Sequence, residues 1–321
     1  MMNNSARRIL YPLADGIFRV YGVLRAKHYD IRNTIVVASS PRGGSTWLAE
    51  IITTLPGYHM LWEPLHLANN PECTHFGFSW QNYLPPGIDA PSQHYYIQQI
   101  LTGSRLSTRI LTRLYLSPLR LLILRGYVVK FVNANTILSW MTDLFPVRAI
   151  FMIRHPCAVV ASQMRHGAWS HLKKHNWTIS KHLFNDYPLL KEVFERVQRP
   201  EELLAFEWVV QNWVPLQTRH PTWILTTYER LATRRETELE RLFVYLGQSV
   251  PPMARSQLYR ASATTVADSH IKTGKNPLTG WQYVLTPRQV DNILNVVYAV
   301  GMTCYSEALE PDYYQLGLKG C

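Results

Sequence analysis

A turn that contains two adjacent glycines is the first feature of the sequence with the residue types for chemistry. It follows the apolar run 35–38 and reads Pro41-Arg42-Gly43-Gly44-Ser45-Thr46-Trp47-Leu48. Glycine allows a tight turn and a close approach of the backbone to a ligand. A helix that begins at Ser45 would direct free amide groups and its dipole at an anion, and Arg42 adds a cation. The turn is therefore a candidate phosphate site, although a Gly-Gly turn before an ordinary helix cap has the same pattern.

The same turn lacks one residue that a nucleoside-triphosphate loop requires. The pattern GxxxxGK[ST] is absent, and with it the lysine that reaches the terminal phosphates. The turn therefore resembles a phosphate cradle that does not need the usual magnesium-bound triphosphate.

A second segment places an arginine where a strand should end. The apolar run 148–153 leads to Arg154, Pro156 is typical of a first helical residue, and Ser162 lies two turns further on. Ligands of open α/β sheets bind at the carboxyl ends of the strands, where an arginine can make paired hydrogen bonds to a phosphate. Taken alone, the segment would favour a plain surface ion pair for Arg154.

The elements that must position these residues are short apolar strands. Five β-branched runs alternate with helical patterns, at 34–38, 58–62, 127–132, 148–153 and 223–227. Such alternation predicts an α/β fold with a P-loop-like central parallel sheet, and right-handed crossovers place helices on both faces. Without a repeat or a linker, we expect a single domain over 1–321.

Three stretches stand outside the alternation. Residues 1–33 are expected to form an N-terminal helical extension, and 71–125 a variable loop and helical insertion. Within the insertion, 71–107 predicts a long loop, and 110–125 a basic amphipathic helix that either packs on the core or lies on a membrane surface. Residues 182–214 predict two helices over the ligand edge of the sheet.

The composition favours an anionic ligand. Lys and Arg number 33 against 22 Asp and Glu, which gives a net charge of +11, although only 17% of the residues are charged. Such a charge favours an anionic ligand, an acidic polymer or a membrane surface. No basic–aromatic repeat is present, so we expect no nucleic-acid partner.

Cysteine usage and the N-terminus predict the compartment. The four cysteines show no CxxC pairing, which predicts neither a metal site nor a disulfide framework. The apolar stretch 9–24 is interrupted by Pro12, Asp15, Gly16 and Arg19, which argues against a membrane span or a secretory signal. We expect a cytoplasmic protein, with peripheral contact at a membrane surface as the alternative for its basic helix.

Together, the glycine turn and the Arg154 segment resemble the sulfotransferase superfamily, whose members use 3′-phosphoadenosine 5′-phosphosulfate (PAPS). The turn matches the family's 5′-phosphosulfate loop, and Arg154, Pro156 and Ser162 match its 3′-phosphate motif. Further similar stretches are 227–231 with 239–247, and Thr273-Gly274-Lys275 with Gly280-Trp281. The resemblance covers about residues 34–303 and implies the sulfotransferase fold.

Two details are closer to the carbohydrate sulfotransferases. These are Arg42 in the loop and Trp62-Glu63-Pro64-Leu65 after the second strand. Sulfotransferases of phenols and steroids usually carry a lysine in the loop and a histidine base two residues beyond a second lysine. Here Lys130 is present, but Val132 occupies the histidine position.

The resemblance implies a role for each matching residue. PAPS, which leaves as adenosine 3′,5′-bisphosphate (PAP), would be bound without a metal by Arg42, Gly43, Gly44, Ser45, Thr46, Trp47, Arg154, Ser162, Tyr228, Lys272 and Lys275. Of these, Trp47 and Tyr228 would contact adenine. Glu63 is the expected general base, with His66 in reserve, and Arg42 and Lys130 would stabilise the transferring sulfonate.

The expected acceptor is a hydroxylated small molecule, a glycan or a lipid, and the resemblance favours a glycan or glycolipid. Two other functions remain open at this point. One is a P-loop kinase-like phosphotransferase, which should need magnesium, a loop lysine and an acidic metal ligand. The other is a non-catalytic basic module that binds nucleotides or membranes.

Overall fold

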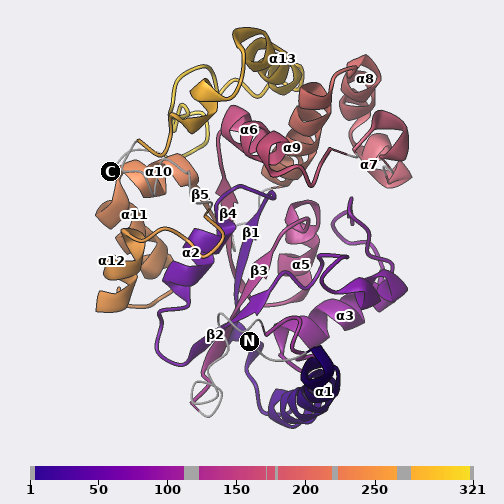
Figure 1. Ribbon diagram of the computed structural model, residues 1–321, viewed down its shortest axis with the longest axis vertical. Helices are drawn as coiled ribbons and strands as arrows, with labels where there is room; N and C mark the ends of the chain where they lie inside the picture. The colour runs from indigo at the N-terminus through magenta and orange to yellow at the C-terminus, as the bar shows by residue number, and fades with distance from the viewer. Residues whose placement is uncertain are drawn as a thin grey trace.

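Five parallel strands form the centre of the molecule in the computed structural model, which describes residues 4–111, 123–170, 172–177, 180–218, 223–265 and 276–318 (Figure 1). Their order in the sheet is β2-β3-β1-β4-β5. The strands are β1 (Ile35–Ser39), β2 (Tyr58–Trp62), β3 (Gly126–Phe131), β4 (Arg148–Ile153) and β5 (Trp223–Thr227). Each coincides, to within one residue at either end, with one of the predicted runs.

Both faces of the sheet are covered because both faces of its strands are apolar. Alternate residues of β1 enter opposite cores: Val36 and Ala38 belong to one cluster, and Ile35 and Val37 to the other. The Ile35 side is covered by α2 (Ser45–Ile52), α10 (Tyr228–Thr233), α11 (Arg235–Tyr245) and α12 (Pro252–Leu258). The opposite side is covered by α3 (Pro91–Leu101) and α5 (Leu138–Leu144), and the same apolar cluster continues into α6 (Pro156–His166), α9 (Pro200–Gln217) and α13 (Pro287–Tyr298). The predicted α/β class is confirmed.

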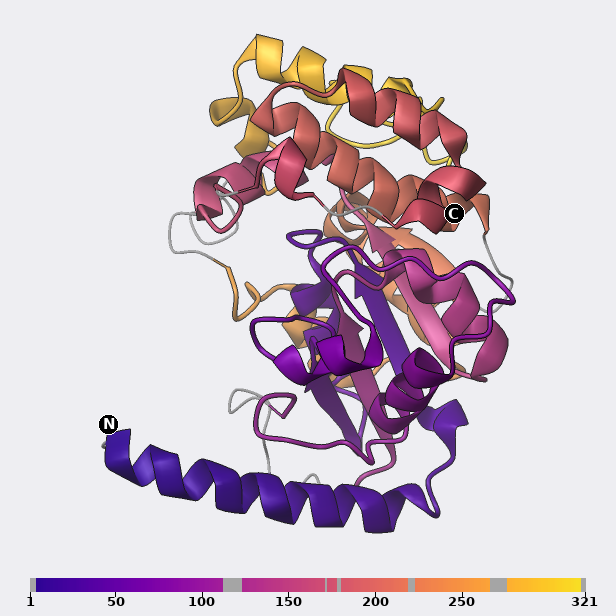
Figure 2. The same ribbon diagram turned by 90° about the vertical axis from the view of Figure 1, so that its right-hand side faces the viewer.

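A helical layer lies beyond the carboxyl ends of the strands. It contains α6, α9 and α13, which contact one another, with α7 (Lys181–Asp186) and α8 (Pro188–Arg196) beside α9 (Figures 1 and 2). The sequence predicted two helices in 182–214, whereas the structure has three. Pro188 and Pro200 each occupy a first-turn position, where the missing N–H is tolerated and where each proline starts a new helix.

The predicted loop 71–107 contains more helix than expected. A 3₁₀ helix spans Pro71–Phe76, and α3 follows at Pro91–Leu101. Tyr96, Ile97 and Ile100 of α3 are buried in the core, so tertiary burial stabilises a helix whose own sequence is largely polar. For the predicted basic helix at 110–125, residues 112–122 lie outside the described residues.

The N-terminal helix α1 (Asn4–Ala26) runs along the end of the molecule opposite the helical layer (Figure 2). Asp15 anchors it by accepting a hydrogen bond of 2.6 Å from the backbone N–H of Thr108. The opposite face leaves apolar side chains exposed, namely Leu13, Ile17, Val20, Val23 and Leu24. None of the helices within the described ranges is both long and apolar enough to span a membrane.

Candidate active site

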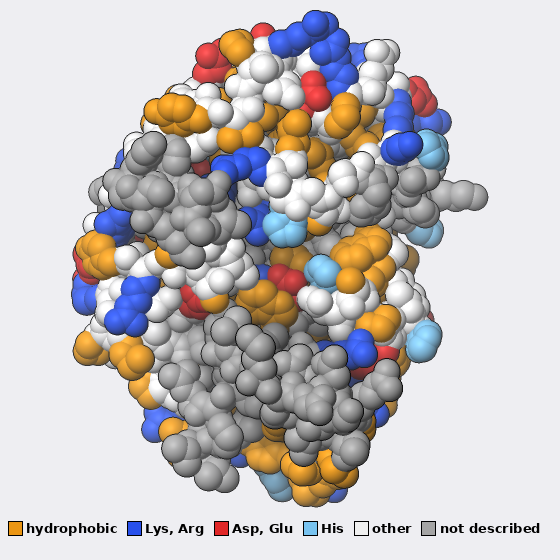
Figure 3. Space-filling model, viewed as in Figure 1, with side chains coloured by type: hydrophobic (Ala, Val, Ile, Leu, Met, Phe, Trp, Pro, Cys, Tyr) orange, Lys and Arg blue, Asp and Glu red, His pale blue; other side chains and the backbone are white. Residues whose placement is uncertain are grey.

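A cavity of about 1290 Å³ opens at the carboxyl edge of the sheet, below the helical layer. Figure 3 shows it as a hollow across the middle of the molecule, with basic, acidic and histidine side chains gathered at it. Most of the sequence-predicted site residues line it, namely Arg42, Gly44, Ser45, Thr46, Trp47, Glu63, Lys130, Arg154, Ser162 and Tyr228. The position matches the strand-end location at which open α/β sheets bind ligands.

The glycine turn between β1 and α2 has a backbone that only glycine fits. A Cβ atom on Gly43 would lie 2.1 Å from Ser39 Oγ and 2.8 Å from the Ser40 carbonyl oxygen. Gly44 has φ +97°, and a Cβ there would lie 2.6 Å from the ring of Tyr228. Helix α2 starts directly after Gly44 and has no side-chain cap, and Ser45 and Thr46 of its first turn line the cavity, so its first amides are available to an anion there.

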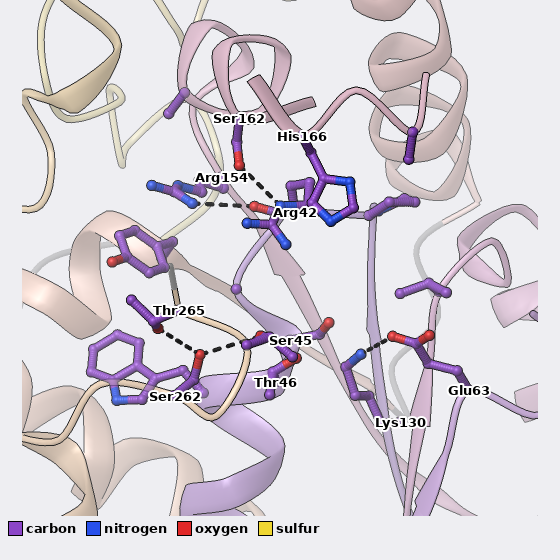
Figure 4. A pocket seen from close by; sticks show the side chains of 18 of the residues that line it. Arg42, Ser45, Thr46, Glu63, Lys130, Arg154, Ser162, His166, Ser262 and Thr265 are labelled. Carbon is purple, nitrogen blue, oxygen red and sulfur yellow. Dashed lines mark hydrogen bonds and ion pairs between the residues drawn. The ribbon is translucent and has the colours of Figure 1, made fainter. Parts of the chain in front are cut away.

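The two predicted anion-binding segments meet in this cavity. Arg42 Nε donates a hydrogen bond of 2.9 Å to Ser162 Oγ, and Arg154 Nη1 donates one of 3.2 Å to the carbonyl of Arg42 (Figure 4). The meeting follows from strand order, because β1 and β4 are neighbours with Ser39 paired to Met152. Residues 120 positions apart in the chain therefore share one wall of the cavity.

The electrostatics of that wall favour an anion. Within the described part of the chain, neither Arg42 nor Arg154 forms an ion pair with a carboxylate. Burial lowers the pKa of the Arg42 guanidinium, as does the neighbouring charge of Arg154, while Glu63 opposes the shift. Arg154 Nε is buried without a partner. Two partly desolvated cations are thus available to a negatively charged ligand.

Two aromatic rings border the arginines. Trp47 and Tyr228 lie with their ring centroids 5.5 Å apart and their planes tilted by 56°. The guanidinium carbon of Arg154 lies 4.1 Å from the centre of the Tyr228 ring, within range of a cation–π contact. Trp47 Nε1 is buried and has no hydrogen-bond partner in the described part of the chain. The wall can therefore offer a planar ligand both ring surface and a hydrogen-bond donor.

The opposite side of the cavity holds an ion pair between Lys130 and Glu63 (Figure 4). Lys130 lies on β3 and Glu63 directly follows β2, and the Glu63 N–H donates to the Lys130 carbonyl at 2.9 Å. The Lys130 side chain is only 2% exposed and that of Glu63 13%. Burial lowers the pKa of Lys130, while the charge and hydrogen bond of Glu63 raise it. A buried lysine is costly unless it pairs with a charge, and Glu63 is that partner.

The remaining predicted residues fall in three places. Gly43 shapes the turn but does not line the cavity, whereas His66 and Val132 do. Lys272 and Lys275 lie outside the described residues. Trp281 stacks on the His155 ring, with the ring centroids 5.0 Å apart, and also lines the cavity.

One cavity residue was missed by the sequence reasoning. Glu207 lies on α9, is 6% exposed and lines the cavity. Its signal is an acidic residue inside the apolar segment Leu203-Leu204-Ala205-Phe206-Glu207-Trp208-Val209-Val210.

No family model and no curated protein matches the sequence. Among solved structures, the chain is similar to the sulfotransferase domain of the Synechococcus PCC 7002 olefin synthase, with 19% identity, 86% and 97% of the two chains covered and a TM-score of 0.45. It is also similar to the sulfotransferase domain from the curacin biosynthetic pathway, with 17% identity, 85% and 97% of the two chains covered and a TM-score of 0.44. A mouse sulfotransferase complexed with PAP is similar at 13% identity, with 87% and 88% of the two chains covered and a TM-score of 0.42. Similarity at this level does not define an activity.

Proposed function

We propose that this protein transfers the sulfuryl group of PAPS to a hydroxyl group of an acceptor. The observation that carries the proposal is the hydrogen bond between Arg42 and Ser162, at 2.9 Å. It joins the loop that resembles a 5′-phosphosulfate site to the helix that resembles a 3′-phosphate site. A single ligand with anionic groups at both positions, such as PAPS, would engage both segments.

The residues of the cavity are suited to each part of this donor. The α2 amides and Arg42 would bind the phosphosulfate, and Arg154 with Ser162 the 3′-phosphate. Trp47 and Tyr228 would contact adenine. The buried Arg154 Nε and Trp47 Nε1, both without a partner, support this assignment, because buried polar groups are normally satisfied. Lys272 and Lys275 are proposed as further donor ligands.

The transfer needs positive charge where negative charge develops. As the S–O bond to the leaving phosphate breaks, charge accumulates on the bridging oxygen and the sulfonate. Arg42 and Lys130, which both line the cavity, would stabilise that charge. We propose that no metal takes part, in keeping with a loop that lacks the lysine pattern of magnesium–triphosphate sites.

The acceptor hydroxyl must lose a proton as it attacks. Glu63 is the proposed base, because its carboxylate reaches the cavity, where the ion pair with Lys130 holds it in place. His66, which packs edge-on against Trp80 with the ring centroids 5.0 Å apart, is the alternative base in the same cavity.

The proposed acceptor is a hydroxyl of a glycan or glycolipid. The support is the resemblance of Trp62-Glu63-Pro64-Leu65 to carbohydrate sulfotransferases and a cavity wall with exposed aromatic surface at Trp80.

Calorimetry of product binding tests the donor assignment. PAP should bind in the presence of EDTA, and at least about tenfold more tightly than AMP, because AMP lacks the group that pairs with Arg154. A magnesium requirement, or equal affinity for the two nucleotides, would overturn the proposal in favour of a kinase-like site. Sulfate transfer from PAPS to a panel of glycosides then tests catalysis, which a binding module would not show.

A further inference from the structure

Glu207 is a buried acid without a partner. Its carboxyl oxygen Oε2 is buried and accepts no hydrogen bond within the described residues. The buried Glu201 and Glu238 have partners, namely Asn292 at 2.8 Å and Arg230 at 2.6 Å, and Glu229 accepts the His155 N–H at 2.8 Å with one oxygen, although its Oε2 is buried without a partner among the described residues. A buried carboxyl without a partner destabilises a fold by a few kcal/mol, so its presence indicates a use other than packing.

The cavity that Glu207 lines also has small and aromatic side chains in its wall. Glu207 lines the cavity together with Ala158 and Ala161 of α6, whose short side chains leave space, and with Trp177 and Trp281. Both indole N–H groups are buried and have no partner among the residues that the structure describes. At about 1290 Å³, the cavity exceeds the roughly 300–1,000 Å³ of a typical single-ligand site, so it has room for a second molecule beside a nucleotide.

The hydrogen-bonding chemistry of these groups indicates the chemical class of the ligand. Burial alone raises the pKa of Glu207 to about 7, so near neutral pH the carboxyl can both donate and accept a hydrogen bond. A hydroxyl group matches such a carboxyl and the indole N–H donors, because it also both donates and accepts. An ammonium group only donates, and the cavity already holds the cations Arg42, Arg154 and Arg165.

We propose that Glu207, Trp177 and Trp281 form an acceptor subsite that binds a second hydroxyl group, so that the acceptor is a ring-bearing polyol such as a sugar. The subsite rests on the proposed sulfuryl transfer, since it would hold the acceptor while another of its hydroxyls reacts at Glu63. The tryptophan rings supply apolar surface for the face of a sugar ring, and Glu207 supplies the polar contact.

The first test measures the protein without any ligand. Glu207→Met should leave the urea midpoint unchanged or raise it, because it removes an unsatisfied buried carboxyl. Glu201→Met is the matched control on the same helix, also 6% exposed but outside the cavity. It should lower the midpoint, since it leaves the Asn292 amide without its acceptor. A midpoint lowered as much by Glu207→Met as by Glu201→Met would assign Glu207 to the fold and overturn the proposal.

The second test measures binding of two probes to the PAP-loaded protein by tryptophan fluorescence. Octyl β-glucoside, below its micelle concentration, carries four hydroxyls, and 1-octanol carries one on the same chain. The wild type should bind the glucoside more tightly than octanol, and Glu207→Met should lose at least about tenfold for the glucoside alone. Glu201→Met should bind both probes as the wild type does, and Glu207→Gln, which keeps an oxygen acceptor, should recover most of the loss.

Two results would overturn the subsite: equal glucoside affinity in the wild type and Glu207→Met, or a wild type that does not prefer the glucoside. PAP calorimetry on the same samples separates this proposal from the donor assignment. Normal PAP binding with no glucoside preference removes only the subsite, whereas absent PAP binding removes the sulfuryl-transfer proposal itself.

Discussion

Lys130 and Glu63 form an ion pair across the ends of two adjacent strands, inside the cavity that also holds Arg42 and Arg154. The ion pair links two residues for which the sequence suggested separate roles, Glu63 as general base and Lys130 in stabilising the sulfonate. Because Lys130 is almost completely buried, its charge depends on Glu63, and a proton that reaches Glu63 weakens the attraction that keeps Lys130 charged. Acceptor deprotonation and sulfonate stabilisation are therefore coupled in the proposed mechanism.

Glu63→Gln should abolish most turnover while leaving donor binding intact. The change is nearly isosteric but removes the base, so kcat should fall by about two to four orders of magnitude. Turnover with saturating acceptor and PAP calorimetry check the two parts. Turnover retained in Glu63→Gln would transfer the role of base to His66, which His66→Gln would then test.

The single variant Lys130→Met should be less stable than the double variant that carries both Lys130→Met and Glu63→Gln. The single change leaves a largely buried carboxylate without its cation, at a cost on the order of 2 kcal/mol, whereas the double change leaves two neutral groups. Urea unfolding of the two single variants and the double variant gives the coupling free energy. Strictly additive losses would show that the pair contributes nothing to stability.

Arg154→Ala should weaken PAP far more than adenosine 5′-phosphosulfate. A charge-assisted, paired contact to the 3′-phosphate contributes about 2 kcal/mol, or at least about tenfold in affinity, and only PAP carries that group. Arg42→Ala should weaken both ligands and reduce turnover, because its charge would meet the phosphosulfate. Calorimetry with both ligands separates the variants, and equal losses in Arg154→Ala would remove the 3′-phosphate assignment.

Gly44→Ala should disable donor binding, whereas Gly87→Ala should not. Both glycines have positive φ, +97° and +76°, so alanine at either position adds strain of about 1 kcal/mol. At Gly44 the new Cβ would also lie 2.6 Å from Tyr228, while at Gly87 nothing lies within 4 Å. We expect PAP affinity to fall at least about tenfold in Gly44→Ala. Similar affinity in the two variants would exclude the turn as the donor cradle.

Glu229 should give the protein a stability that falls with rising pH. Burial raises its pKa to about 7, above the roughly 4.3 of an unfolded glutamate. Its contribution is therefore fully present below about pH 4.3 and is lost as the pH rises through about 7. The unfolding free energy of the wild type, relative to that of Glu229→Gln, should then fall by up to about 3 kcal/mol between pH 4.5 and 7.5. Parallel urea profiles at all pH values would contradict this.

The sheet was predictable from the sequence because each strand is a short apolar run bounded by turn residues. Pro188 and Pro200 were equally visible, yet only two of the three helices that they delimit in this region were predicted. Helix α3 was missed for a different reason. Its stability comes from burying Tyr96 and Ile100 against the sheet, a tertiary effect that its polar sequence does not reveal.

The candidate site was predictable where its requirements are local. Gly43 and Gly44 are both needed by one turn, and because they are adjacent in the sequence this requirement can be recognised from the sequence alone. The contact between Arg42 and Ser162 depends instead on β1 and β4 being neighbours, and the sequence does not state the strand order. Glu207 depends on how α9 packs over α6, which is again a property of the assembled layers.

The central place of β1 also sets when this site can exist during synthesis. The chain reaches the two neighbours of β1 only at residues 126 and 148, and Ser162 emerges later still. More than a hundred further residues must therefore be synthesised after the glycine turn before the segment with Arg154 and Ser162 is available to complete the site. Since such long-range pairing slows folding and exposes apolar strands, a nucleotide that binds only the finished cavity would draw late-folding molecules into the native state.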